Sequence, residues 1–87
     1  MITPQEIRNY VVENFLFGTD DGLDDETSFL ERGILDSTGV LELVSHLETA
    51  YGVKVEDHEL LPDNLDSIQL ICAFVARKQA AAATAAV

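Results

Sequence analysis

Tryptophan is absent from this 87-residue sequence, and cysteine occurs only once. The single cysteine, Cys72, excludes an internal disulfide and a metal site built on several thiolates. No apolar run approaches the roughly 20 residues that a membrane-spanning helix needs. The first six residues lack the basic start and the apolar stretch of a secretory signal peptide. We therefore expect a cytoplasmic protein with no membrane association.

Positive charge is also scarce. Five Lys and Arg stand against 16 Asp and Glu, which gives a formal net charge of −11. A nucleic-acid binder needs clustered basic side chains to contact phosphates, so this class is excluded. Partner proteins with basic surfaces would be attracted instead. The length allows one small domain without a large enclosed cleft, and a monomer is the simplest state.

Two apolar periodicities predict long helices in the first two thirds of the chain. Thr3 is suited to cap a helix that begins at Pro4, with Glu6 completing a capping box, and Gly18 is expected to end it. A second helix should run from Asp36 or Ser37 to Tyr51, because apolar residues recur there at helical spacing and Gly52 follows.

A third helix should open at Asp66 or Ser67, where Gln69 would complete a capping box with Asp66. The Ala-rich segment 80–87 has little to hold it, so we expect a folded domain over residues 1–79 and a disordered tail. Between the helices, one or two short helical turns are expected over residues 56–64. The sum is an all-α fold, a small antiparallel three- to four-helix bundle.

A long connection joins the first two helices, from Gly18 to Asp36. Its first half is strongly acidic and should be solvated. Loops of this length are usually functional or held by apolar residues. The second half contains four apolar residues that we expect to hold the loop against the core, namely Phe29, Leu30, Ile34 and Leu35.

Most catalytic and metal-binding patterns are missing. His46 and His58 are far apart in sequence and have no cysteine beside them. The acidic loop does not fit a calcium-binding EF-hand, because Phe17 would stand at the first ligand position and Ser28 at the last. Ser37 lacks the first glycine of a nucleophile elbow, since Leu35 stands there. No metal site and no enzymatic activity are expected.

A serine at the start of the second helix is the remaining candidate site. Ser37, or Asp36 before it, could serve only as an N-cap, the commonest role for such a residue. The same position also suits a phosphodiester, because a helix N-terminus offers free N–H groups and a positive dipole end. On this second interpretation Ser37 is a point of attachment and not a nucleophile in turnover.

The outward face of this helix is suited to bind a protein. Ser37, Leu41 and Glu48 follow one another along that face, and Thr38 and Glu42 flank them. An exposed leucine among acids fits docking to a basic partner, although such acids also occur on ordinary solvated helix faces.

The sequence resembles the acyl carrier proteins, including the peptidyl and aminoacyl carriers. The resemblance covers about residues 4–78 and is carried by Leu35-Asp36-Ser37, then Val40-Leu41-Glu42-Leu43-Val44 and Leu47-Glu48. It implies that residues 1–79 form a carrier domain of the acyl-carrier type. It also implies a covalent 4′-phosphopantetheine on Ser37, added from coenzyme A by a phosphopantetheinyl transferase with Asp36 helping to present the serine.

Further implications concern cargo and partners. The thiol of the arm would hold an acyl or aminoacyl group as a thioester and present it to biosynthetic enzymes. A loading ligase and downstream enzymes would contact Thr38, Leu41, Glu42 and Glu48. Cys72 is not this thiol, because it lies on the apolar stripe of the third helix. The cargo, whether fatty acyl, polyketide, amino acid or D-alanine, is not specified by the sequence.

Two residues depart from the family pattern. Thr38 stands where the family commonly has leucine, and Gly39 where it often has aspartate. We expect the first helical turn to be less apolar, less acidic and looser for this reason. The run Gly33-Ile34-Leu35-Asp36-Ser37 resembles discrete D-alanyl or peptidyl carriers more than the housekeeping fatty-acid carrier.

Other hypotheses stay open at this point. The chain could be an acidic interaction bundle without a prosthetic group, in which Ser37 is only a cap. It could also be a small enzyme using its carboxylates, or a protein regulated by phosphorylation at Ser37.

Overall fold

The computed structural model describes residues 2–16, 18 and 22–85, with side chains described as far as residue 81. Its elements are α1 (Pro4–Phe15), α2 (Phe29–Arg32), α3 (Ser37–Tyr51), the 3₁₀ turn η1 (Asp57–Glu59), α4 (Pro62–Leu65) and α5 (Ile68–Ala85). Within these residues there is no strand. The all-α bundle predicted from the sequence is confirmed.

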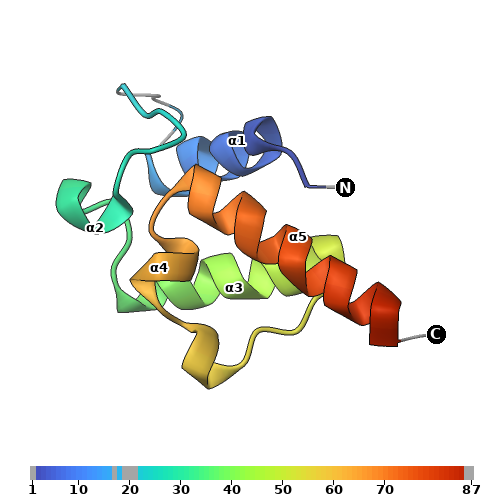
Figure 1. Ribbon diagram of the computed structural model, residues 1–87. Helices are drawn as coiled ribbons and strands as arrows, with labels where there is room; N and C mark the ends of the chain where they lie inside the picture. The colour runs from blue at the N-terminus through green and yellow to red at the C-terminus, as the bar shows by residue number, and fades with distance from the viewer. Residues whose placement is uncertain (1, 17, 19–21, 86–87) are drawn as a thin grey trace.

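The three long helices surround one core, and α2 and α4 close it at one end (Figure 1). In this view α1 runs towards the left, whereas α3 and α5 run towards the right. The first turn of α3 lies on the left, and both ends of the described chain lie on the right. No helix in the described part of the chain is long and apolar enough to cross a membrane.

α1 begins at its predicted capping residue, whereas α5 is capped by Ser67 and not by Asp66. Thr3 Oγ1 accepts a hydrogen bond from the Glu6 N–H at 3.2 Å, as its position predicts. At the start of α5, Ser67 Oγ accepts from the Leu70 N–H at 3.1 Å. The prediction that Asp66 caps α5 is wrong, because its carboxylate accepts hydrogen bonds from the Leu30 N–H of α2 and from the hydroxyl of Ser28, the residue before α2.

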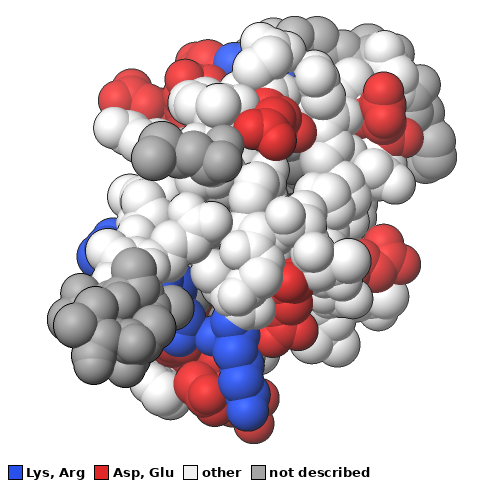
Figure 2. Space-filling model, turned by 90° about the vertical axis from the view of Figure 1, so that its right-hand side faces the viewer, with Lys and Arg blue, Asp and Glu red and all other residues white. Residues whose placement is uncertain are grey.

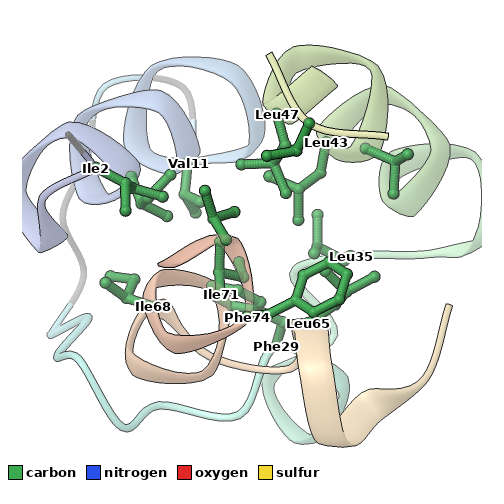
Figure 3. Packing of buried hydrophobic residues seen from close by; sticks show 14 of the residues in the cluster. Ile2, Val11, Phe29, Leu35, Leu43, Leu47, Leu65, Ile68, Ile71 and Phe74 are labelled. Carbon is green, nitrogen blue, oxygen red and sulfur yellow. The ribbon is translucent and has the colours of Figure 1, made fainter. Parts of the chain in front are cut away.

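The core is built from the apolar faces that the periodicities predicted. Figure 3 shows side chains of α1, α3 and α5 pointing to a common centre, where residues of the connections join them. The buried apolar residues are Ile2, Ile7, Val11, Leu23, Phe29, Leu35, Leu43, Val44, Leu47, Val53, Leu65, Ile68, Ile71, Phe74 and Val75. Burial of this continuous cluster is the main stabilising contribution.

The long connection between α1 and α3 contains a helix that we did not predict. Ser28 Oγ caps α2 by accepting from the Glu31 N–H at 3.2 Å, and Gly33 ends the helix with a φ of +66°. Phe29 and Leu35 are buried and hold the connection to the core, as expected. Leu30 is 56% exposed, so the expectation that it also holds the loop inward is wrong.

The C-terminal helix extends beyond the expected domain boundary. The backbone of residues 80–85 is helical, because alanine has the highest helix propensity and α5 is already nucleated by packed turns. Residues 86–87 lie outside the described residues, and the division at residue 79 stays a prediction. Lys78 Nζ lies 2.7 Å from Glu59 Oε1, which ties α5 to η1.

Acidic side chains are distributed over the molecule and not confined to one patch. On the side shown in Figure 2 they occupy several separate places, whereas the basic side chains gather mainly near the lower edge. A second ion pair joins Arg8 of α1 to Asp25 at 3.1 Å. Part of the acidic loop, residues 19–21, lies outside the described residues.

Candidate functional site

Ser37 is the first residue of α3, and its side chain is exposed together with those of Asp36 and Thr38. The N-cap is Asp36, whose Oδ1 accepts a hydrogen bond from the Gly39 N–H at 2.7 Å. The extended backbone of Asp36 lets its carboxylate turn back over the first helical turn. The Ser37 hydroxyl therefore does not serve as the cap and faces solvent.

The first turn of α3 suits a negatively charged substituent. It contains no acidic residue, and the N–H groups at a helix start carry the positive end of the helix dipole. A phosphate on the Ser37 oxygen would thus sit at the favourable end of a helix that extends to Tyr51. The geometry fits the attachment of a phosphodiester.

Gly39, two residues after Ser37, allows the end of α1 to pack closely against the first turn of α3. It is buried, and a Cβ built on it would lie 3.1 Å from a Phe15 ring carbon and 3.3 Å from a Leu35 methyl carbon. We expected Gly39 to loosen the first turn of α3. The structure shows that the missing side chain lets the end of α1 and the preceding loop pack against it.

Only part of the predicted partner-binding face of α3 is exposed. Leu41 is 60% exposed, and Thr38 and Glu42 are exposed beside it. Glu48 is half-buried, and its Oε2 accepts a hydrogen bond from the Val55 N–H at 2.9 Å. Glu48 therefore holds the non-helical segment that follows α3, a role that the sequence analysis missed.

An aromatic cluster joins α1 and α3 near Glu42. The Tyr10 ring stacks on His46 with a centroid distance of 3.9 Å, and the Tyr10 hydroxyl donates to the Glu42 carbonyl at 3.3 Å. Tyr51 meets the edge of the His46 ring, with the centroids 6.2 Å apart. Burial among these rings lowers the pKa of His46 from its ordinary value of 6.5.

Acidification should destabilise the bundle through this histidine. Because its folded pKa is lowered, the unfolded chain binds more protons as the pH falls below about 6.5, and the His46 contribution to stability is lost there. The measurement is the free energy of unfolding of the wild type and His46→Phe between pH 8 and pH 5. The difference between them should be constant above about pH 7.5 and shift against the wild type below 6.5. Parallel curves over the whole range would contradict this.

Among residues 2–16, 18 and 22–85 there is no group of three or more His, Cys, Asp or Glu side chains that could hold a metal ion. Cys72 is half-buried against the core, in agreement with its expected packing role, and burial raises the pKa of its thiol.

Comparison with known proteins adds to this geometry. Residues 5–75 match the family described as "Phosphopantetheine attachment site". The chain belongs to this carrier protein family. It is also 35% identical over 72 residues to the "Probable acyl carrier protein PigG" of Serratia sp. (strain ATCC 39006), a match that covers 83% of each protein. The resemblance drawn from the sequence is confirmed.

A solved structure also matches this carrier chain. It belongs to a crystal structure described as an FAD-dependent dehydrogenase. The TM-score is 0.73 at 33% sequence identity, and the match covers 79% of this chain and 97% of that one.

Membership of this carrier family defines the general role of the protein. It is an acyl carrier protein that holds its cargo on a covalently attached 4′-phosphopantetheine. Its partners include a phosphopantetheinyl transferase and biosynthetic enzymes. The alternative of an acidic interaction module without a prosthetic group is not favoured.

Proposed function

We propose that Ser37 is the residue to which 4′-phosphopantetheine is attached. The supporting observation is that Asp36, and not Ser37, caps α3, which leaves an exposed hydroxyl at a helix N-terminus. Ser37 also lies within the matched residues 5–75. Ser45 is exposed too, but it lies two turns further along α3, away from the free N–H groups of the first turn.

The side chains around Ser37 have separate roles in this proposal. The thiol of the bound arm supplies a thioester linkage for an acyl or aminoacyl group. Asp36 fixes the start of α3 and so presents the serine hydroxyl to the transferase. Thr38, Leu41 and Glu42 contact the enzymes that act on the cargo, with Glu48 at the edge of that face. The protein itself catalyses no reaction and works as a cytoplasmic monomer with residues 1–79 as its carrier domain.

We further propose that one of its partners is an FAD-dependent dehydrogenase. The matched chain of the dehydrogenase crystal structure is shorter than this one and is covered almost completely by it. A crystal structure described as a dehydrogenase therefore contains a chain about as long as a carrier protein. The cargo of the present protein would then be an acyl or aminoacyl group that is oxidised while it is tethered to the arm.

The test of the attachment site uses the purified apo protein, coenzyme A and a broad-specificity phosphopantetheinyl transferase. We expect intact mass spectrometry to show a gain of one phosphopantetheine per chain, and peptide mapping to place that mass on Ser37. A protein that stays unmodified while circular dichroism shows it folded would contradict the proposal and favour the interaction module. A smaller gain that requires a kinase would instead indicate phosphorylation.

A further inference from the structure

The ring of Phe15, the last residue of α1, packs against the first turn of α3. Gly39 is buried there, and a Cβ built on it would lie 3.1 Å from Phe15 Cε1 and 3.3 Å from a Leu35 methyl carbon. Carbon atoms in ordinary van der Waals contact are about 3.5–4.0 Å apart. The ring therefore occupies the space that a side chain at residue 39 would need, and it brings α1 against the backbone of α3.

The same glycine takes part in the cap of α3. Its N–H donates a hydrogen bond to Asp36 Oδ1 at 2.7 Å, and a Cβ on it would lie 3.3 Å from that oxygen. Ser37 lies between these two residues in the sequence, and its own side chain is exposed. The position of the Ser37 hydroxyl is therefore set by the backbone on either side, through the Asp36 cap and the contact at Gly39.

Contacts within α1 and from α3 define the position of the Phe15 ring. The Tyr10 ring meets it in an edge arrangement, with the centroids 5.8 Å apart and the planes at 69°. Tyr10 is itself joined to α3, because its hydroxyl donates to the Glu42 carbonyl at 3.3 Å. Directly after Phe15, the Leu16 N–H donates to the Val11 carbonyl at 3.2 Å and closes the end of α1. The ring thus supports the first turn of α3 from a defined position.

We propose that Phe15 is a positioning residue for the modification of Ser37. By packing on Gly39, its ring holds the capped first turn of α3 in the arrangement that presents the hydroxyl to the transferase. The inference rests on the proposed function, because it concerns the attachment of the arm at Ser37.

The chemistry of the attachment explains why the position of the hydroxyl matters. The Ser37 oxygen forms a bond to the phosphorus next to pantetheine in coenzyme A, while the bond from that phosphorus to the bridging pyrophosphate oxygen breaks. Adenosine 3′,5′-bisphosphate leaves with the electron pair, and the hydroxyl proton passes to a base of the transferase or to water. The attacking and leaving oxygens have to be in line, so a misplacement of about 1 Å can slow such a step about 100-fold.

A purely structural role for Phe15 predicts a different kinetic change. If the ring only stabilised the bundle, its truncation would lower the folded fraction of the carrier. The transferase concentration needed for half-saturation would then rise, whereas the rate constant at saturation would stay the same. A misplaced hydroxyl lowers the rate constant at saturation instead.

The experiment measures single turnovers of the apo protein with coenzyme A and an excess of a broad-specificity phosphopantetheinyl transferase. Phe15→Ala should lower the rate constant at saturation about tenfold, with the half-saturating concentration changed less than about twofold. Phe15→Leu keeps most of the apolar volume and should recover most of the rate. Val12→Ala is the matched control, since Val12 is a half-buried side chain of α1 packed on the core, and the three atoms nearest a Gly39 Cβ come from other residues. Its rate constant should equal that of the wild type.

A variant at Gly39 tests the same contact from the other side. Alanine is normally favoured over glycine in a helix, so Gly39→Ala would stabilise α3 if nothing lay against it. Because its Cβ would press on Phe15, we expect Gly39→Ala to lower the rate constant at saturation. In Phe15→Ala the added Cβ has room, so the second substitution should cause no further loss and the two effects should not add.

Amide hydrogen exchange gives a readout that does not depend on the transferase. The Gly39 N–H, which is bonded to Asp36, should exchange about tenfold faster in Phe15→Ala, because the first turn of α3 opens more often. The N–H of Leu47, a buried residue further along α3, should keep its wild-type rate and so report that the bundle is intact.

Three results would overturn the inference. They are a wild-type rate constant at saturation in Phe15→Ala, additive effects of Phe15→Ala and Gly39→Ala, and equal losses of rate in Phe15→Ala and Val12→Ala. A failure of the proposed function is recognised separately. The wild type itself would then gain no mass at Ser37, and the inference would fall with it, whereas a failure of the positioning role appears only in the variants.

Discussion

Ser37→Ala should lose the phosphopantetheine mass gain completely while the bundle keeps its stability. The modification needs the serine oxygen, which alanine lacks. Stability should change by no more than about 0.5 kcal/mol, as for an exposed residue without a structural role. The reason is that Asp36 accepts the hydrogen bond from the Gly39 N–H and so caps α3 without Ser37. Intact mass and urea unfolding of the same sample measure both effects.

Two matched variants make this test specific. Asp36→Ala removes the cap and should cost about 1 kcal/mol of unfolding free energy. Ser45→Ala removes an exposed hydroxyl from the same helix and should keep both the mass gain and the stability. If Ser37→Ala instead lost the stability expected for Asp36→Ala, Ser37 would be the cap. Retention of the mass gain in Ser37→Ala would move the attachment site elsewhere.

Phe29→Ala should be the most damaging change in the long connection between α1 and α3. The Phe29 ring is only 1% exposed, and truncation of a buried phenylalanine costs about 3–5 kcal/mol. Because domains of this kind are stable by only about 5–15 kcal/mol, a substantial part of that margin would be lost. The same ring lines an apolar pocket together with Leu65 of α4, so the variant should also weaken the packing of α2 against α4.

The neighbouring residue provides the control for this prediction. Leu30→Ala lies in the same helix at a 56% exposed position and should cost less than about 1 kcal/mol. Urea unfolding measures both values, and amide hydrogen exchange of residues 28–32 reports whether α2 opens. Equal losses for the two variants would show that Phe29 does not hold the connection to the core.

The sequence predicted the parts of the fold that depend on local patterns. Apolar periodicity indicated the three long helices, and the capping preference of Thr3 placed the start of α1 correctly. The proposal of attachment at Ser37 rests on its position before an apolar helical face together with the family resemblance. These features are readable because the signals lie within a few residues of one another.

Other features depend on contacts between distant segments and could not be predicted. Asp66 and Ser67 are both good capping residues, and only the proximity of α2 decides that Asp66 binds Leu30 and Ser28 while Ser67 caps α5. The close packing of Phe15 against Gly39 depends on where α1 lies relative to α3, so it could not be predicted from the sequence of α3 alone. The hydrogen bond from the Val55 N–H to Glu48 could not be predicted either, because a helical pattern does not show which later segment returns to α3.

The two ends of the described chain lie on the opposite side of the bundle from the first turn of α3 (Figure 1). Immobilising the protein on a sensor surface through a tag at either end should therefore leave the first turn of α3 turned towards the solution. The same arrangement allows a fluorophore to be joined to the chain without obstructing an approaching enzyme.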